Sequence, residues 1–267
     1  MSSLYLAAGD LAPEHLLELR AAKAALESPG FAIQLVNFLG VPIEHGVVHL
    51  PVKWREKIVA ISRIALEKAA DIALWSVDPT VPRSANDLLH KLAVTSTGAI
   101  GGAFGLSTLA LELPLSTTVM LRSIADIARS EGEDLQDPNA KFACLSVFAL
   151  GGRTTTDDAT EAAYYVTRLG LAQTVSEAAQ HLVSKHALKS AAPPLLKLIQ
   201  NIAARFSLQV SEKAAAQAVP IIGAAGGAFV NFLFISHYQK MAKGHFTIRR
   251  LERLYSPEQI ESCYRDI

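Results

Sequence analysis

The sequence predicts an all-α protein, a single multi-helix bundle built around two glycine-rich helical hairpins. Apolar residues recur at helical spacing along most of the chain, and no stretch of any length alternates in the manner of a β-strand. A short segment also occurs twice, as Gly-Ala-Ile-Gly-Gly-Ala-Phe at 98–104 and as Gly-Ala-Ala-Gly-Gly-Ala-Phe at 223–229. These observations indicate a weak internal repeat whose two halves share one core.

The first helices are separated by proline and glycine. Pro13 suits the first turn of a helix over 13–27, and a short apolar helix over 31–39 ends at Gly40. The strongest periodic pattern, over 52–77, predicts a long helix with one apolar stripe. Residues 41–51 between them show no helical periodicity, so we expect an irregular connection there.

The middle of the chain carries the first glycine motif. A helix over 84–111 holds that motif, and Pro114 opens the next helix, over 115–130. An apolar helix over 139–150 follows an acidic turn and is stopped by Gly151 and Gly152. The first hairpin is therefore expected to be a glycine helix, a short break and an amphipathic helix.

The second half repeats this order after two long helices. Asp157 and Asp158 suit the start of a helix that runs to about residue 190, and a second helix spans 195–218. The second glycine motif leads into helices over 231–242 and 246–254, and Pro257 opens a closing helix. We predict one domain over 1–267, with an N-terminal helical extension over 1–51, a core over 52–256 and a C-terminal helix over 257–267.

Each glycine motif lies within an uncharged run, 92–111 and 214–236. Because a glycine inside a helix costs about 0.5–1 kcal/mol relative to alanine, close helix packing is expected to offset it. The runs fit either a tightly packed helix pair in a soluble core or a hairpin that inserts into a membrane or binds an apolar ligand. The glycines expected at helix contacts are Gly98, Gly101, Gly102, Gly105, Gly223, Gly226 and Gly227.

Composition narrows the function classes. Lys plus Arg equals Asp plus Glu, 25 each, so no global field attracts nucleic acid. The two cysteines are far apart and form no disulfide framework. Residues 1–10 are too weakly apolar for a signal peptide, and both uncharged runs are rich in Gly, Ala, Ser and Thr. We expect a cytoplasmic protein that can associate peripherally with a membrane; composition leaves the oligomeric state open.

Six polar residues are candidates for a ligand site. Glu112 follows an apolar run, where a carboxylate must be paired, protonated or solvated, and we expect it to pair with Arg122 or Arg168. Asn231 follows the second glycine motif in the same way. Glu161, Tyr164 and Arg168 share one helix face and suit either an anion or headgroup site or a polar network between helices.

No catalytic or metal motif supports a specific chemistry. The sequence holds no nucleophile elbow, Walker A loop, Rossmann fingerprint, paired-cysteine motif or EF-hand loop, so we predict no catalytic residue and no cofactor. His45 and His49 have the spacing of a helical metal pair, but Gly46 and the two valines disfavour a helix, and we predict no metal site.

The order of several motifs resembles the EcsC family of bacterial proteins. The motifs are the glycine-rich helix at 97–102 with Glu112-Leu113-Pro114 and Arg122, the Gly-Gly-Arg turn at 151–153 with Glu161, Tyr164 and Arg168, and the segment from Val219 through Asn231 to Phe246, Arg249 and Leu251. Together they span about residues 55–256. The resemblance implies a cytoplasmic protein and a partnership with an ABC-type transporter, and it brings no agreed biochemical activity.

These observations favour a non-enzymatic helical protein that acts at a membrane. It would bind a lipid or an apolar small molecule, or dock to a membrane transporter. Two alternatives stay open: a hydrolase with an acid site around Glu112 and Glu161, and a purely structural protein–protein interaction module.

Overall fold

Every regular element in the described part of the chain is a helix, which confirms the all-α fold class. The computed structural model describes residues 11–28, 30–40, 52–71, 109–152, 163–185, 193–217 and 223–267. The helices are α1 (Pro13–Leu26), α2 (Phe31–Leu39), α4 (Val52–Ala69), α6 (Leu109–Ser130), α7 (Pro138–Ser146), the 3₁₀ turn η3 (Val147–Ala149), α8 (Ala163–Lys185), α9 (Pro193–Gln217), α10 (Gly223–Leu254) and α11 (Pro257–Asp266).

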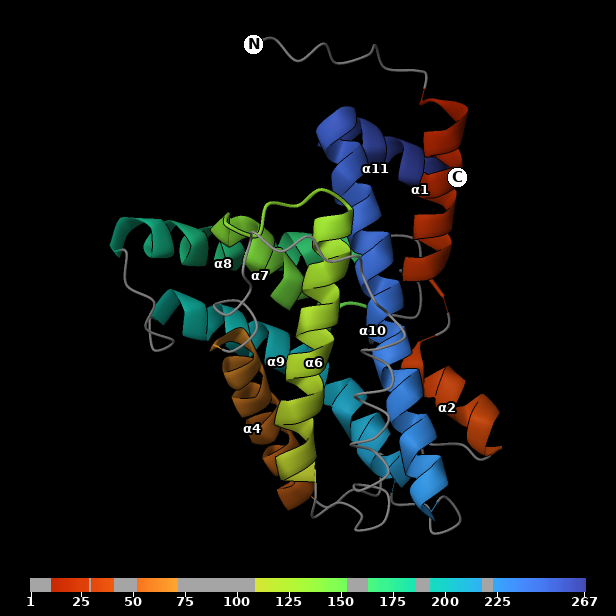
Figure 1. Ribbon diagram of the computed structural model, residues 1–267, viewed down its shortest axis with the longest axis vertical. Helices are drawn as coiled ribbons and strands as arrows, with labels where there is room; N and C mark the ends of the chain where they lie inside the picture. Colours follow the sequence, from red (N-terminus) through yellow and green to blue (C-terminus); the bar gives the residue numbers. More distant parts are fainter. Residues whose placement is uncertain are drawn as a thin grey trace.

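Helix α10 is the element around which the other helices pack. It contacts α1, α2, α6, α9 and α11, while α4 packs against α6 and α9, and α7 packs against α8. Figure 1 shows α6 and α10 running side by side along the length of the molecule, with α7 and α8 to one side, α1 and α2 to the other, and α9 passing behind α6. The site described below lies where α7 and α8 meet α10.

One continuous helix replaces the separate pieces expected after residue 223. α10 spans Gly223–Leu254 without interruption, although Gly244 lies within it. A methyl group on Gly244 would lie 2.7 Å from Leu26 Cγ and 3.0 Å from the carbonyl oxygen of Ala22, both on α1. The glycine therefore allows two helices to approach closely and does not end the helix.

Helix α6 also differs from the expectation, because it begins at Leu109 and passes through Pro114. A proline lacks the N–H that an interior helical position donates, and its ring crowds the carbonyl one turn earlier. Pro114 lies inside α6, so the helix lacks one hydrogen bond there. The expected break between the glycine helix and the amphipathic helix is absent over 109–130.

Local capping explains other helix boundaries. Asp137 accepts a hydrogen bond from the backbone N–H of Asn139 at the start of α7, and Ser256 accepts one from Gln259 at the start of α11. Gly151 ends the segment after η3 with a positive φ of 68°. A methyl group there would lie 2.6 Å from His237 Cε1, so only glycine fits this turn.

The core is one connected cluster that reaches from α1 to α11. At its centre, Phe148 of η3 packs against Phe206 of α9 and Tyr238 of α10, with ring centroids 5.1 and 5.0 Å apart. Within the described residues, no helix is both long enough and apolar enough to cross a membrane. Residues 98–105 lie outside them, so the pairing of the two glycine-rich hairpins stays a prediction, as does the division into one domain.

Candidate functional site

Glu112 lies in the core where α6, α9 and α10 meet. Its side chain is nearly inaccessible, and Lys213 Nζ of α9 donates to its Oε1 at 2.6 Å. Asn231 Nδ2 of α10 donates to the same oxygen at 2.8 Å. The two polar residues that follow the two glycine motifs therefore bind each other, across 119 positions of sequence.

The partner of Glu112 differs from the expected one. It is the fully buried Lys213, whereas the Arg122 side chain is exposed and Arg168 pairs with Glu252. The Lys213 ammonium also lies 4.9 Å from the centroid of the Phe234 ring, a cation–π contact. A buried carboxylate needs a counter-charge, and α9 supplies the nearest one. The expectation that Arg122 or Arg168 pairs with Glu112 is wrong.

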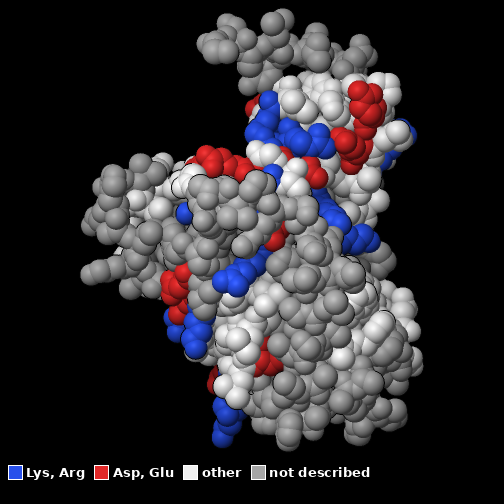
Figure 2. Space-filling view, in the orientation of Figure 1, with Lys and Arg blue, Asp and Glu red and all other residues white. Residues whose placement is uncertain are grey.

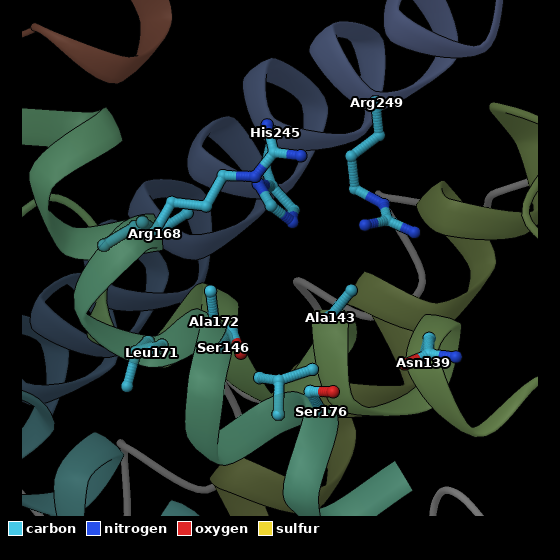
Figure 3. Close-up of a pocket in the computed structure, with 11 residues that line it drawn as sticks. Asn139, Ala143, Ser146, Arg168, Leu171, Ala172, Ser176, His245 and Arg249 are labelled. Carbon is cyan, nitrogen blue, oxygen red and sulfur yellow. The ribbon is translucent and has the colours of Figure 1, made fainter. Parts of the chain in front are cut away.

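A cavity of about 230 Å³ lies between α7, α8 and α10. Figure 3 shows Arg168, His245 and Arg249 on one side of it and Ala143, Ser146, Ala172 and Ser176 on the other. Apolar side chains form much of the wall. The residues that line the cavity are Asn139, Ala143, Ser146, Leu150, Arg168, Leu171, Ala172, Val175, Ser176, His245 and Arg249.

Arg168 connects α8 to α10 beside this cavity. Its two terminal nitrogens donate to the two carboxylate oxygens of Glu252 at 2.5 and 2.6 Å, a bidentate pair. Burial alone would lower the pKa of Arg168, but the hydrogen bond and charge of Glu252 outweigh it and raise that pKa. The guanidinium is therefore a permanent cation at the cavity wall.

His245 is held neutral by the same surroundings. Burial, together with the charges of Arg168 and Arg249, keeps the pKa of its imidazole well below the ordinary value. Its Nδ1 lies 2.9 Å from Tyr164 Oη, which accepts a long hydrogen bond from Arg168 at 3.5 Å. Burial raises the pKa of Tyr164, so its hydroxyl keeps its proton and can donate it to Nδ1. This arrangement assigns the ring proton of His245 to Nε2.

Arg249 is fixed by Glu133, at the end of α10 away from the glycine motif. Its Nε and Nη2 donate to Glu133 at 2.8 and 2.9 Å, and Arg253 binds the same carboxylate. Burial would raise the pKa of Glu133, but these two arginines outweigh it and lower that pKa. Figure 2 shows acidic and basic side chains gathered at this end of the molecule.

The arrangement suits binding better than bond-breaking chemistry. The imidazole of His245 is neutral, and the hydroxyl of Ser146 donates to the carbonyl of Phe142. Burial raises the pKa of the Cys144 thiol, which disfavours a thiolate nucleophile. Across the described residues, no group of three or more His, Cys, Asp or Glu could hold a metal ion.

The structure brings together some of the predicted site residues and separates others. Tyr164 and Arg168 lie one turn apart on α8, and Arg168 lines the cavity while Tyr164 contacts its wall through His245. Glu112 and Asn231 form the separate core cluster. Glu161, His45 and His49 lie outside the described residues. A hydrolase built on Glu112 would need a carboxylate that reaches a substrate, but Lys213 and Asn231 hold this one inside the core.

Sequence reasoning missed Lys213, His245 and Glu252. Lys213 had a readable signal, because it directly precedes the uncharged run 214–236, as Glu112 directly follows the run 92–111. Two opposite charges at the boundaries of two apolar runs are candidates for a buried pair. His245 and Glu252 lie on α10 seven residues apart, so they share a face, but nothing local indicates that α8 covers that face.

A family model described as the EcsC protein family matches residues 47–251 of the chain. The matched range includes Glu112, Lys213, Asn231 and the cavity residues. Comparisons with curated proteins and with solved structures give no match.

Proposed function

We propose that this protein, which belongs to the EcsC protein family, works at a membrane surface without catalysing a reaction. The observation that carries the proposal is the change from uncharged to charged residues along α6 and α10. Both helices begin in an uncharged run, 92–111 and 214–236, and both end among ion pairs. The uncharged starts of α6 and α10 lie at the same end of the molecule (Figure 1).

Exposed leucines mark this apolar end. Leu111 and Leu115 lie one turn apart on α6, and their exposed fractions are 76% and 61%. Transfer of a leucine side chain from water to an apolar phase contributes about 1.5–3 kcal/mol. Two such side chains, with Phe229 of α10 partly exposed as well, support reversible peripheral binding to a bilayer.

The opposite end is polar and charged. Arg250 of α10 binds Glu131 and Glu18 there, each at 2.8 Å, beside the Arg249 and Arg253 pairs with Glu133. Ion pairs of this kind are stable in water and unfavourable in hydrocarbon. The end that carries Leu111 and Leu115 is therefore the one we assign to the membrane.

Co-sedimentation with lipid vesicles tests the proposal. Full-length protein is mixed with vesicles of zwitterionic and anionic lipid, and the bound fraction is compared for wild type and a Leu111→Gln/Leu115→Gln double variant. Glutamine keeps the helix propensity of leucine, so only the apolar surface changes. We expect the double variant to bind at least about tenfold more weakly.

Leu17→Gln is the matched control, because Leu17 is 64% exposed on α1 at the other end of the molecule. It should bind vesicles as wild type does. The proposal would be overturned if wild type stayed in the supernatant, or if Leu17→Gln weakened vesicle binding as much as the Leu111→Gln/Leu115→Gln variant. Sedimentation with native membranes but not with protein-free vesicles would replace the lipid surface by a membrane protein such as an ABC-type transporter.

A further inference from the structure

We propose that the cavity between α7, α8 and α10 binds a small organic carboxylate, with its anionic group towards Arg168, His245 and Arg249 and its apolar part towards α7 and α8. The site lies towards the charged end of α10, so it is distinct from the surface formed by Leu111 and Leu115. The proposal therefore goes beyond membrane contact and does not depend on it.

The charges of the lining select an anion. Two of the lining residues, Arg168 and Arg249, are guanidinium cations, and none is an aspartate or glutamate. Their carboxylate partners, Glu252 and Glu133, are not among the residues that line the cavity. Each bidentate pair uses two of the five N–H donors of a guanidinium, which leaves further donors for a second acceptor.

His245 adds a donor whose partner is missing. Its side chain is 4% exposed, and Figure 3 shows its ring projecting from α10 towards the cavity. Nε2 is buried and has no hydrogen-bond partner in the described part of the chain. A buried N–H without an acceptor is unfavourable, and a carboxylate oxygen would supply that acceptor. Successive hydrogen bonds from Glu252 through Arg168 and Tyr164 hold this ring with Nε2 as the donor.

The size and the apolar wall define the rest of the ligand. Leu171, Ala172 and Val175 of α8 and Ala143 of α7 all line the cavity. An apolar cavity of about 150 Å³ holds a benzene molecule. A cavity of about 230 Å³ therefore has room for a ring or short chain of about six to eight carbons together with a carboxylate.

Calorimetric titration of the full-length, lipid-free protein tests the proposal with three probes of one chain length: octanoate, octan-1-ol and octylammonium. We expect octanoate to bind at least tenfold more tightly than octan-1-ol, and octylammonium not to bind. Val175→Phe, which fills the apolar part, should abolish octanoate binding. Equal affinity for octanoate and octan-1-ol, or unchanged octanoate binding by Val175→Phe, would overturn the proposal.

His245→Phe tests the role of Nε2 with the ring volume nearly kept. It should weaken octanoate at least fivefold and leave octan-1-ol binding unchanged. His15→Phe is the matched control, because His15 also binds a tyrosine hydroxyl, that of Tyr255 at 2.7 Å, but is absent from the cavity. Equal octanoate affinity in wild type and His245→Phe would remove His245 from the site. If His245→Phe does not fold, the three probes and Val175→Phe still test whether the cavity binds a carboxylate.

Discussion

Replacing Gly244 by alanine places a methyl group in the contact between α10 and α1. The new carbon would lie 2.7 Å from Leu26 Cγ, 3.2 Å from Leu26 Cδ2 and 3.0 Å from the carbonyl oxygen of Ala22. Carbon atoms in favourable contact are about 3.5–4.0 Å apart, so the nearest pair overlaps by about 0.8 Å. Leu26 can change rotamer, but the Ala22 oxygen belongs to the backbone, so α1 itself must move.

Two opposing terms set the magnitude. Alanine inside a helix is about 1 kcal/mol more favourable than glycine, whereas overpacking a close contact costs about 1–3 kcal/mol and occasionally more. We therefore expect Gly244→Ala to lower the free energy of unfolding by up to about 2 kcal/mol. Urea titration followed by circular dichroism measures this change through the midpoint at an unchanged slope.

Gly170→Ala isolates the packing term. Gly170 lies inside α8, and a methyl group there would meet no heavy atom within 4 Å. Gly170→Ala should raise the free energy of unfolding by about 0.5–1 kcal/mol through helix propensity alone. The difference between the two variants is then the overpacking term, about 1–3 kcal/mol. If Gly244→Ala stabilises the protein as much as Gly170→Ala, the inferred close approach of α1 to α10 is refuted.

Two further predictions concern buried polar groups. Lys213→Met leaves the buried Glu112 carboxylate without its counter-charge and should lower the free energy of unfolding by about 3–5 kcal/mol. The Glu112→Gln/Lys213→Met double variant should lower it by clearly less. Equal decreases for the two variants in urea titration would contradict the pairing. Burial and the charge of Lys240 lower the pKa of His237 to about 4, from 6.5, so its contribution to stability is complete above pH 6.5 and is lost as the pH falls to about 4. That loss is about 3 kcal/mol, and His237→Phe should reduce the slope of unfolding free energy against pH over this range.

Helix type and several boundaries could be predicted from the sequence because their causes are local. Pro13 and Pro257 begin helices where the expected patterns place them, and Gly40 ends α2 with a left-handed cap. For the same local reasons Pro114 was expected to open a new helix, and a gap was expected between the helices over 231–242 and 246–254, where Gly244 lies. In the folded protein both lie inside helices, because one lost hydrogen bond or one glycine costs less than the packing of α6 and α10 contributes.

The candidate site was predictable only in part. Tyr164 and Arg168 share a face because they are one helical turn apart, and the structure places both beside the cavity. The sequence also marked Glu112 as a carboxylate that needs a partner, since it borders an apolar run. It could not identify Lys213, which is 101 positions away, because that choice depends on how α9 crosses α6.

The sequence by itself determined that the chain is helical, that Glu112 and Asn231 follow the two glycine motifs, and that the family is EcsC. These properties follow from spacing over one or two helical turns and from the order of short motifs. Only the tertiary structure decided that Glu112 binds Lys213 and Asn231, and that His245 meets Tyr164 beside a cavity. Such contacts join residues more than eighty positions apart, and they depend on the packing of whole helices, which no local pattern encodes.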